Sequence, residues 1–280
     1  HIDNRVETHE QFAQTFSLKK GIKVFGEQGS DAAYKEMKQL HDRVVFEPLK
    51  LSEMNAQERK RAMESLIFLT QKRDGLVKAR TCANGSTQRE YTEREEAASP
   101  TASTDSIIIT SIIDAKKERD VMTSDVPNAF VQTDIPVSGE MVVMKIRGAL
   151  VDMLVDMCPE LYADHVVMHG NEKILYVRML KALYGMLVAS ILYYKKFVKD
   201  IESIGFVLNP YDPCLANRAV DGKQHTIAWH VDDIKSSHVA KKVNDEFLKW
   251  LEKTYGEDGI ATTKSTPSTK PNQPATTLHP

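Results

Sequence analysis

Two adjacent aspartates, Asp232 and Asp233, interrupt an otherwise apolar run at residues 227–234. Neighbouring side chains on an extended strand point to opposite faces, so two acids that serve one site must lie at a bend. Val231-Asp232-Asp233 is therefore predicted to form the tip of a tight hairpin. Carboxylates this close repel each other, and a divalent cation removes that penalty because hard cations prefer carboxylate oxygens. The alternative is an exposed turn without chemistry, because Asp is a common turn residue.

A third acid, Asp125, ends the strand-like segment at residues 121–126. Pro127 follows it shortly afterwards and cannot donate a backbone hydrogen bond, so the strand should end there. A carboxylate at a strand end either faces a cleft or caps a helical turn. One acid from a separate strand together with a pair at a turn is an arrangement that holds two magnesium ions, about 4 Å apart.

A basic pair, Lys78 and Arg80, follows the hairpin signal Asp74-Gly75. Residues two apart on a strand share a face, so both side chains should project together. Phosphoryl transfer depends mainly on positioning and charge neutralisation, and Arg can contact phosphate oxygens in a bidentate manner. The pair is therefore either a triphosphate contact or a solvated strand edge that discourages aggregation.

The composition is ordinary for a globular protein, with 280 residues, 41% hydrophobic residues and a net charge of −2. This length suits one large domain or two small ones, and any nucleic-acid surface would have to be local. Three scattered cysteines indicate a reducing compartment rather than a zinc site or disulfide framework. No apolar run approaches the roughly 18 residues of a membrane span, and no signal-peptide pattern is present. We expect an intracellular protein without membrane contact, not a secreted one.

The order of helical and strand patterns predicts an α+β fold with an antiparallel sheet. We expect a polar lead-in at 1–29, a structured region at 30–256 and a disordered tail at 257–280. The expected helices cover residues 30–41, 56–64, 103–118, 149–157, 187–204 and 239–255. The expected strands cover residues 66–69, 76–80, 121–126, 141–146, 165–168, 174–178, 214–218 and 225–230. Phosphate loops, GxSxG elbows, HExxH and CxxC motifs are missing from the sequence.

Several of these segments together resemble copia-type retrotransposon reverse transcriptases. The stretch DVPNAFVQ at 125–132 resembles the first catalytic motif of that family, and HVDD at 230–233 resembles its Tyr-Val-Asp-Asp box. LYG at 183–185 is similar to the opening of the template-side motif, and KAR at 78–80 to the fingers hairpin. FEP at 46–48, EAASP at 96–100 and NPYDPC at 209–214 also match in the same order. The similarity runs from about Phe16 to Gly256, and the order and spacing make it specific.

The resemblance implies a right-hand polymerase fold with fingers and an antiparallel palm sheet covered by helices. It implies an RNA-directed DNA polymerase that uses two Mg²⁺ ions, or Mn²⁺, and binds deoxynucleoside triphosphates and an RNA or DNA template-primer. The implied metal ligands are Asp125, Asp232, Asp233 and the carbonyl of Val126. The implied nucleotide contacts are Lys78, Arg80 and Phe130. The ring of Phe130 would exclude a ribose 2′-hydroxyl, and the alternative is that Phe130 is an ordinary core residue. Tyr184, Gly185 and His230 would lie on the template or primer side.

Three departures from the family pattern weaken the expected activity. Leu187-Val188 stand where the family commonly has Lys-Gln, and His230 stands where it has Tyr. The similarity ends near Gly256, so we expect the thumb to be missing and this chain to be a weak or inactive polymerase. Other parts of a retrotransposon polyprotein are expected partners, in a cytoplasmic particle or the nucleus. Two alternatives are a non-catalytic nucleic-acid-binding remnant and an unrelated two-metal nuclease or phosphatase; the latter usually recruits more acids or histidines in short motifs.

Overall fold

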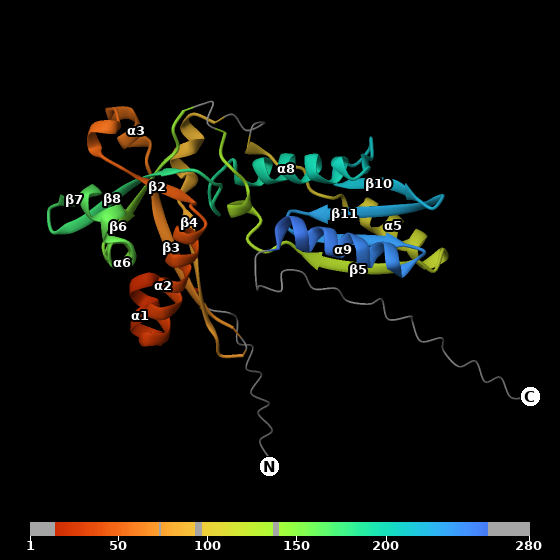
Figure 1. Cartoon of the computed structure of the whole chain (residues 1–280), viewed down its shortest axis with the longest axis horizontal. Helices are drawn as coiled ribbons and strands as arrows, with labels where there is room; N and C mark the ends of the chain where they lie inside the picture. The colour runs from red at the N-terminus through yellow and green to blue at the C-terminus, as the bar shows by residue number, and fades with distance from the viewer. Residues whose placement is uncertain (1–14, 73, 93–96, 137–139, 257–280) are drawn as a thin grey trace, which may run out of the picture. The chain divides into compact units, whose positions relative to one another are not determined.

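The computed structural model describes residues 15–72, 74–92, 97–136 and 140–256 (Figure 1). The chain divides into two compact units. Unit 1 comprises His1–Ala97 and Thr133–Leu192, and unit 2 comprises Ala98–Gln132 and Tyr193–Pro280. Both units combine helices with a sheet, which confirms the α+β class. The sequence predicted one structured region at 30–256, whereas the chain leaves unit 1 and returns to it before it ends in unit 2.

Unit 1 contains a seven-stranded sheet in the order β1-β3-β6-β8-β2, with β4 also paired to β3 and β7 to β8. Its strands are β1 (Thr15–Ser17), β2 (Phe46–Leu49), β3 (Met63–Gln71), β4 (Val77–Ala83), β6 (Val143–Arg147), β7 (Val166–His169) and β8 (Glu172–Met179). Its helices are α1 (Leu18–Phe25), α2 (Glu27–Asp42), α3 (Ala56–Arg61), α6 (Ala149–Met157) and α7 (Pro159–Tyr162), with short 3-10 turns η1 (Leu51–Glu53), η2 (Gly85–Glu90) and η4 (Ala163–His165). β3 pairs with β6 in parallel, and the other strand pairs among the described residues of unit 1 are antiparallel.

The polar lead-in prediction is wrong for residues 15–29, which form β1, α1 and the start of α2. Leu18 and Phe25 pack against the small core of Leu69 and Val77 under the β3–β4 hairpin (Figure 1). Gly21 lies so close to Leu69 that a Cβ there would stand 3.0 Å from the leucine Cβ. Glycines lower helix propensity, but this tertiary packing overrides the local preference. Residues 1–14 lie outside the described residues.

Several local predictions in unit 1 are confirmed. β3 and β4 form the hairpin expected around Asp74-Gly75, and α6 has the predicted bounds. The strands expected at 165–168 and 174–178 are present as β7 and β8, which pair as a second hairpin. Asn55 caps α3, its side chain accepting hydrogen bonds from the next turn. That helix ends at Arg61 rather than near residue 64, because Met63 already begins the buried strand β3.

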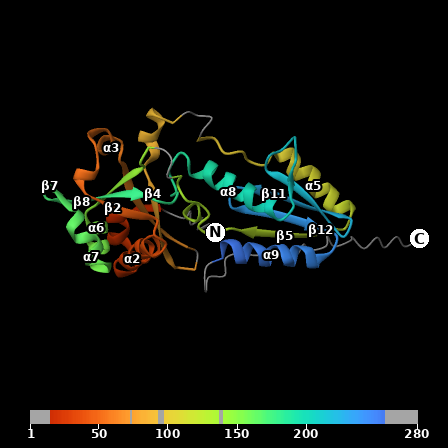
Figure 2. The ribbon, with the colours of Figure 1, turned by 45° about the horizontal axis from the view of Figure 1, so that its top comes forward.

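Unit 2 contains a five-stranded antiparallel sheet in the order β5-β12-β11-β10-β9. Its strands are β5 (Asp120–Asp125), β9 (Val207–Leu208), β10 (Leu215–Val220), β11 (Lys223–His230) and β12 (Asp233–His238). Its helices are α5 (Thr104–Lys116), α8 (Ala189–Ser203) from Tyr193 onward, α9 (Lys241–Tyr255) and the 3-10 turn η3 (Phe130–Gln132). α9 runs along β5 and β12 (Figure 2). The helices predicted at 187–204 and 239–255 are therefore confirmed, with each boundary within two residues of the prediction and the end at Tyr255 matching it.

One face of this sheet carries an aromatic core. Phe197 of α8 and Phe247 of α9 pack with Ile227 and Trp229 of β11, all of them buried. Both tyrosines of α8 join this packing, Tyr193 as a core member and Tyr194 at its border, as the sequence favoured. Across the described residues, no helix has both the length and the apolar character needed to cross a membrane. The predicted tail at 257–280 lies outside the described residues.

The same face holds a chain of hydrogen bonds that links four strands, β10, β11, β12 and β5, to α9. The Nε of Arg218 donates to Nδ1 of His225 at 3.1 Å, so Nε2 carries the proton and donates to Ser236 Oγ at 2.8 Å. Ser236 then donates to the Asn244 carbonyl oxygen at 2.9 Å, and the Asn244 amide donates to Asp120. Burial lowers the pKa of His225 to about 3, and the charge of Arg218 acts in the same direction. The imidazole is thus held neutral.

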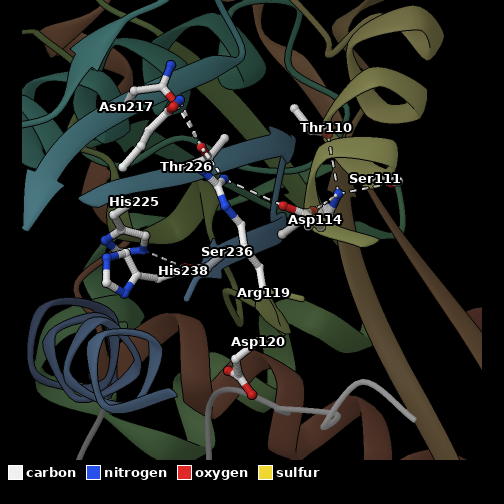
Figure 3. Close-up of polar contacts among 12 residues, drawn as sticks. Thr110, Ser111, Asp114, Arg119, Asp120, Asn217, His225, Thr226, Ser236 and His238 are labelled. Carbon is white, nitrogen blue, oxygen red and sulfur yellow. Dashed lines mark hydrogen bonds and ion pairs between the residues drawn. The ribbon is translucent and has the colours of Figure 1, made fainter. Parts of the chain in front are cut away.

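The opposite face is covered by α5 through polar contacts. Lys235 of β12 forms an ion pair with Asp114 at 2.7 Å, and Asp114 also lies 3.6 Å from Arg119. Arg119 donates to Thr226 at 3.1 Å (Figure 3). Asp114 and Arg119 are buried, so their charges depend on each other and on Lys235 for compensation. Ser103 is the N-cap of this helix, and its side chain accepts a hydrogen bond from the Ser106 N–H.

Candidate functional site

The three aspartates lie at one end of the unit 2 sheet. β5 and β12 are antiparallel neighbours, and their register places Asp125 directly opposite Asp233. Directly opposite residues in such a pair share a face, with Cβ atoms about 4.5–5.5 Å apart. The prediction that the two acid-bearing strands are neighbours in one antiparallel sheet is confirmed.

The tip of the hairpin consists of Val231 and Asp232, because His230 at the end of β11 pairs with Asp233 at the start of β12. Val231 has a φ of 58°, a conformation that is a genuine outlier for a β-branched residue. The backbone N–H of Val126 donates to the Asp232 carbonyl at 3.0 Å. This bond fixes the tip against the end of β5. The predicted tight hairpin is confirmed, and it stores backbone strain beside the acids.

Exposure alternates along β5 toward the acids. Ser124 and Val126 are buried, whereas Asp125 between them is exposed. β5 therefore anchors itself in the core through its neighbours while it presents the Asp125 carboxylate to solvent. His230 is likewise exposed and lies beside Asp233 in the register.

Phe130 follows Asp125 by one turn and lies in η3. Its ring packs edge-on against Tyr193, with centroids 6.3 Å apart, and it is half-buried at the border of the aromatic core. A half-buried ring at this position can serve packing and still present an edge to a ligand. The sugar-gate role stays a prediction.

Gln132 is a positioning residue that sequence analysis did not single out. Its amide nitrogen donates to the Pro127 carbonyl at 2.7 Å and to the Tyr255 carbonyl at 2.9 Å. It therefore ties the turn after Asp125 to the end of α9. The position of Gln132 inside the motif at 125–132 could have indicated a role for it. Its hydrogen bond to Tyr255, which lies 123 residues away, could not be predicted from the sequence.

A second group of predicted site residues meets in unit 1. Lys78 and Arg80 are both exposed and share a face of β4, as their spacing predicted. The guanidinium of Arg80 lies over the Tyr184 ring, 4.6 Å from its centroid, a favourable cation–π distance. Partial burial lowers the pKa of Lys78, and the neighbouring ammonium of Lys72 lowers it further. The β3–β4 hairpin and the segment at residues 183–185 are thus in direct contact.

Two glycines make this contact close. The Ala83 N–H donates to the Tyr184 carbonyl at 2.7 Å. A Cβ on Gly185, whose φ is +87°, would overlap the Ala83 carbonyl, and a Cβ on Gly85 would overlap the Gly185 carbonyl. The segment with Tyr184 can therefore lie against β4 because both positions lack side chains.

Gln88 is a second residue that the sequence did not single out. It is buried, and its side-chain oxygen accepts a hydrogen bond from the Leu187 N–H at 2.8 Å. It fixes the backbone at Leu187-Val188, the two positions that depart from the family pattern. Lys78, Arg80, Tyr184 and Gly185 belong to unit 1, and the aspartates, Val126, Phe130 and His230 to unit 2. The prediction that Lys78 and Arg80 face the acids stays a prediction.

The donor chemistry at the sheet end suits a hard divalent cation. Asp125, Asp232 and Asp233 contribute only oxygen donors, the type that Mg²⁺ prefers. Among the described residues, no group of three or more His, Cys, Asp or Glu side chains is already gathered closely enough to hold a metal ion. The register of β5 and β12 brings these acids to one end of the sheet, which is the observation that supports a shared ion.

The comparisons with known proteins give no family for this chain. No family model matches it, and no curated protein matches it significantly.

Proposed function

We propose that this chain is the RNA-directed DNA polymerase region of a copia-type retrotransposon polyprotein, with weak or no activity by itself. The observation that carries the proposal is the register of β5 and β12, which brings Asp125 opposite Asp233 beside the tip residue Asp232. These acids come from segments more than 100 residues apart and belong to the two motifs that resemble the catalytic motifs of that family. We further propose that the two units correspond to fingers and palm elements.

Asp125, Asp232 and Asp233, with the Val126 carbonyl, would hold the divalent ions. The chemistry supplied by two ions held there would be activation of a hydroxyl nucleophile and stabilisation of the leaving pyrophosphate oxygens. The residues around the acids position them: the hydrogen bond from Val126 to Asp232 fixes the tip, and Gln132 fixes the turn after Asp125. Such positioning is central because a misplacement of about 1 Å can cost a hundredfold in rate.

The unit 1 group supports a nucleotide-binding role. Lys78 and Arg80 offer two exposed cations on one strand face, and Arg80 is held by its contact with Tyr184. Oriented cations of this kind are suited to the phosphates of a deoxynucleoside triphosphate. Phe130 would border the sugar and disfavour a 2′-hydroxyl. The template-primer would pass on the side of Tyr184, Gly185 and His230.

One observation favours a second candidate, a nucleic-acid-binding remnant without catalysis. Leu187 and Val188 are half-buried and apolar where the resemblance leads us to expect Lys-Gln. Val188 cannot form the hydrogen bonds that an amide side chain forms. A decayed copy could keep the fold and bind a template while it loses the contacts that align it.

The test is primer extension on an RNA template with Mg²⁺ or Mn²⁺, together with a template-binding assay. The full chain is compared with Leu187→Lys/Val188→Gln and with Asp232→Asn in each background. Asp245→Asn is the matched control, because Asp245 lies in the same unit, is exposed and pairs with Lys241 on α9. Extension that Asp232→Asn abolishes and Asp245→Asn spares supports the polymerase. Binding without extension in both backgrounds supports the remnant, and the loss of both binding and extension refutes the two proposals.

A further inference from the structure

Helix α5 has an unusual distribution of polarity. The residues of α5 that face the sheet are Thr110, Ser111 and Asp114, of which Thr110 and Asp114 are buried. They contact the sheet through the ammonium of Lys235. Four of the five isoleucines of the helix lie away from these polar residues; the fifth, Ile107, lies beside them and is 36% exposed. A helix of a globular protein normally buries its apolar stripe, so this arrangement requires an explanation.

The outward face carries four isoleucines, which we name the isoleucine stripe. They are Ile108, Ile109, Ile112 and Ile113, exposed by 52%, 56%, 61% and 36%. Their spacing of i, i+1, i+4 and i+5 gathers them on one side of the helix. Isolated exposed apolar residues are normal, whereas a contiguous patch of this kind marks an interaction surface.

The stripe is bordered by one charge at each end, and the charges have opposite signs. Asp105 lies in the first turn of α5 and Lys116 in the last. Both residues continue the spacing of the stripe, three residues before Ile108 and three after Ile113. When two copies of this helix are laid antiparallel about the midpoint between Thr110 and Ser111, the facing pairs are Asp105 with Lys116, Ile108 with Ile113 and Ile109 with Ile112. The sequence of the stripe is therefore complementary to itself.

We propose that the isoleucine stripe is a dimerisation surface whose partner is α5 of a second copy of this chain, packed antiparallel across a two-fold axis. A two-fold interface uses the same patch on both subunits, so its contacts must be self-complementary. The antiparallel arrangement satisfies this in three ways: isoleucine meets isoleucine, each Asp105 meets a Lys116, and the two helix dipoles run in opposite directions. A parallel arrangement would instead place like charges together at both ends.

The size of the surface predicts a reversible dimer. A helix of 13 residues is roughly 20 Å long, and one pair buries less than the about 1,200–2,000 Å² of a standard stable interface. Self-association of the full chain should therefore increase with concentration, which sedimentation velocity measures directly. The wild-type chain is expected to shift from monomer to dimer over a roughly hundredfold concentration range.

The decisive experiment exchanges the charges. In Asp105→Lys both ends of the stripe are positive, and in Lys116→Asp both ends are negative. Each variant alone should dimerise more weakly, on the order of tenfold, because two favourable pairs become repulsive. An equimolar mixture of the two variants should form heterodimers, since every facing pair is again opposite in charge. Recovery on mixing cannot arise from misfolding or from a loss of helix stability in either variant.

Two further variants test the apolar part. Ile112→Lys should abolish self-association, whereas Val207→Lys should leave it unchanged, because Val207 is also exposed, at 71%, but lies on β9 outside the stripe. Circular dichroism verifies that each variant is folded. The proposal is overturned if the wild-type chain stays monomeric, as it would if another part of the chain covered α5. It is equally overturned if the dimer tolerates Ile112→Lys or if the two charge variants do not pair on mixing.

Discussion

Gly185→Ala should destabilise unit 1 far more than the same change at Gly75. The two glycines have nearly equal dihedrals, with φ of +87° and +83°. They differ in their surroundings: a Cβ on Gly75 meets nothing within 4 Å, whereas one on Gly185 overlaps the Ala83 carbonyl. The pair of variants therefore separates the cost of the backbone conformation from the cost of the overlap.

The magnitude follows from the contacts that must be lost. The left-handed conformation costs an alanine about 1–2 kcal/mol at either position. To relieve the overlap, the segment must move away from β4 and give up the hydrogen bond from Ala83 to Tyr184, worth about 1 kcal/mol. The contact between Arg80 and Tyr184 contributes about 0.5–1 kcal/mol. We expect Gly185→Ala to cost about 2 kcal/mol more than Gly75→Ala.

Urea unfolding measures the difference in the free energy of unfolding, and amide hydrogen exchange at Ala83 reports whether the segment opens locally. An expected difference of about 2 kcal/mol moves the urea midpoint by about 1 M when m is about 2 kcal/mol/M. Faster exchange at the Ala83 amide in Gly185→Ala but not in Gly75→Ala would locate the loss. Equal midpoints and equal exchange in the two variants would refute the close approach of the segment to β4.

Three other predictions concern unit 2. Asp114→Asn leaves the charge of Lys235 without its partner in a buried site and should cost about 3 kcal/mol in urea unfolding, against less than about 1 kcal/mol for the exposed Asp245→Asn; equal costs would contradict the buried pair. Burial lowers the pKa of His225 to about 3 in the folded chain. Below pH 6.5 the unfolded chain binds a proton at this residue and the folded chain does not, so the free energy of unfolding should fall by about 1.4 kcal/mol per pH unit. Urea unfolding of His225→Gln at a series of pH values should lack this slope. If the proposed polymerase function holds, Phe130→Ala in an active variant should admit ribonucleotides while it spares deoxynucleotide use, and an unchanged preference would remove the sugar-gate role.

Several local elements could be predicted from short stretches of sequence. The hairpin around Asp74-Gly75 was predicted because turn chemistry depends on adjacent residues only. Ser103 at the start of α5 and the strand end at Asp125 were predicted for the same reason. The sequence also indicated that Asp125 belongs with the acids at 232–233, through the order and spacing of motifs.

The tertiary structure alone decided how these elements meet. The direct register of Asp125 with Asp233 joins residues 108 positions apart, and it depends on which faces of β5 and β12 are buried. The close approach of Gly185 to Ala83 likewise depends on backbone placement that periodicity does not encode.

Two helices, α1 and α5, illustrate the same limit. Residues 18–25 were expected to be a loose lead-in, but they fold because Leu69 offers them an apolar surface. The isoleucines of α5 predicted a helix but not its orientation. The ion pairs of Asp114 with Lys235 and Arg119 form on the sheet side of the helix. They hold the polar side of α5 against the sheet, and the isoleucine stripe therefore faces outward. Periodicity records which residues share a face of a helix, whereas the partners available in the folded chain decide which face is buried.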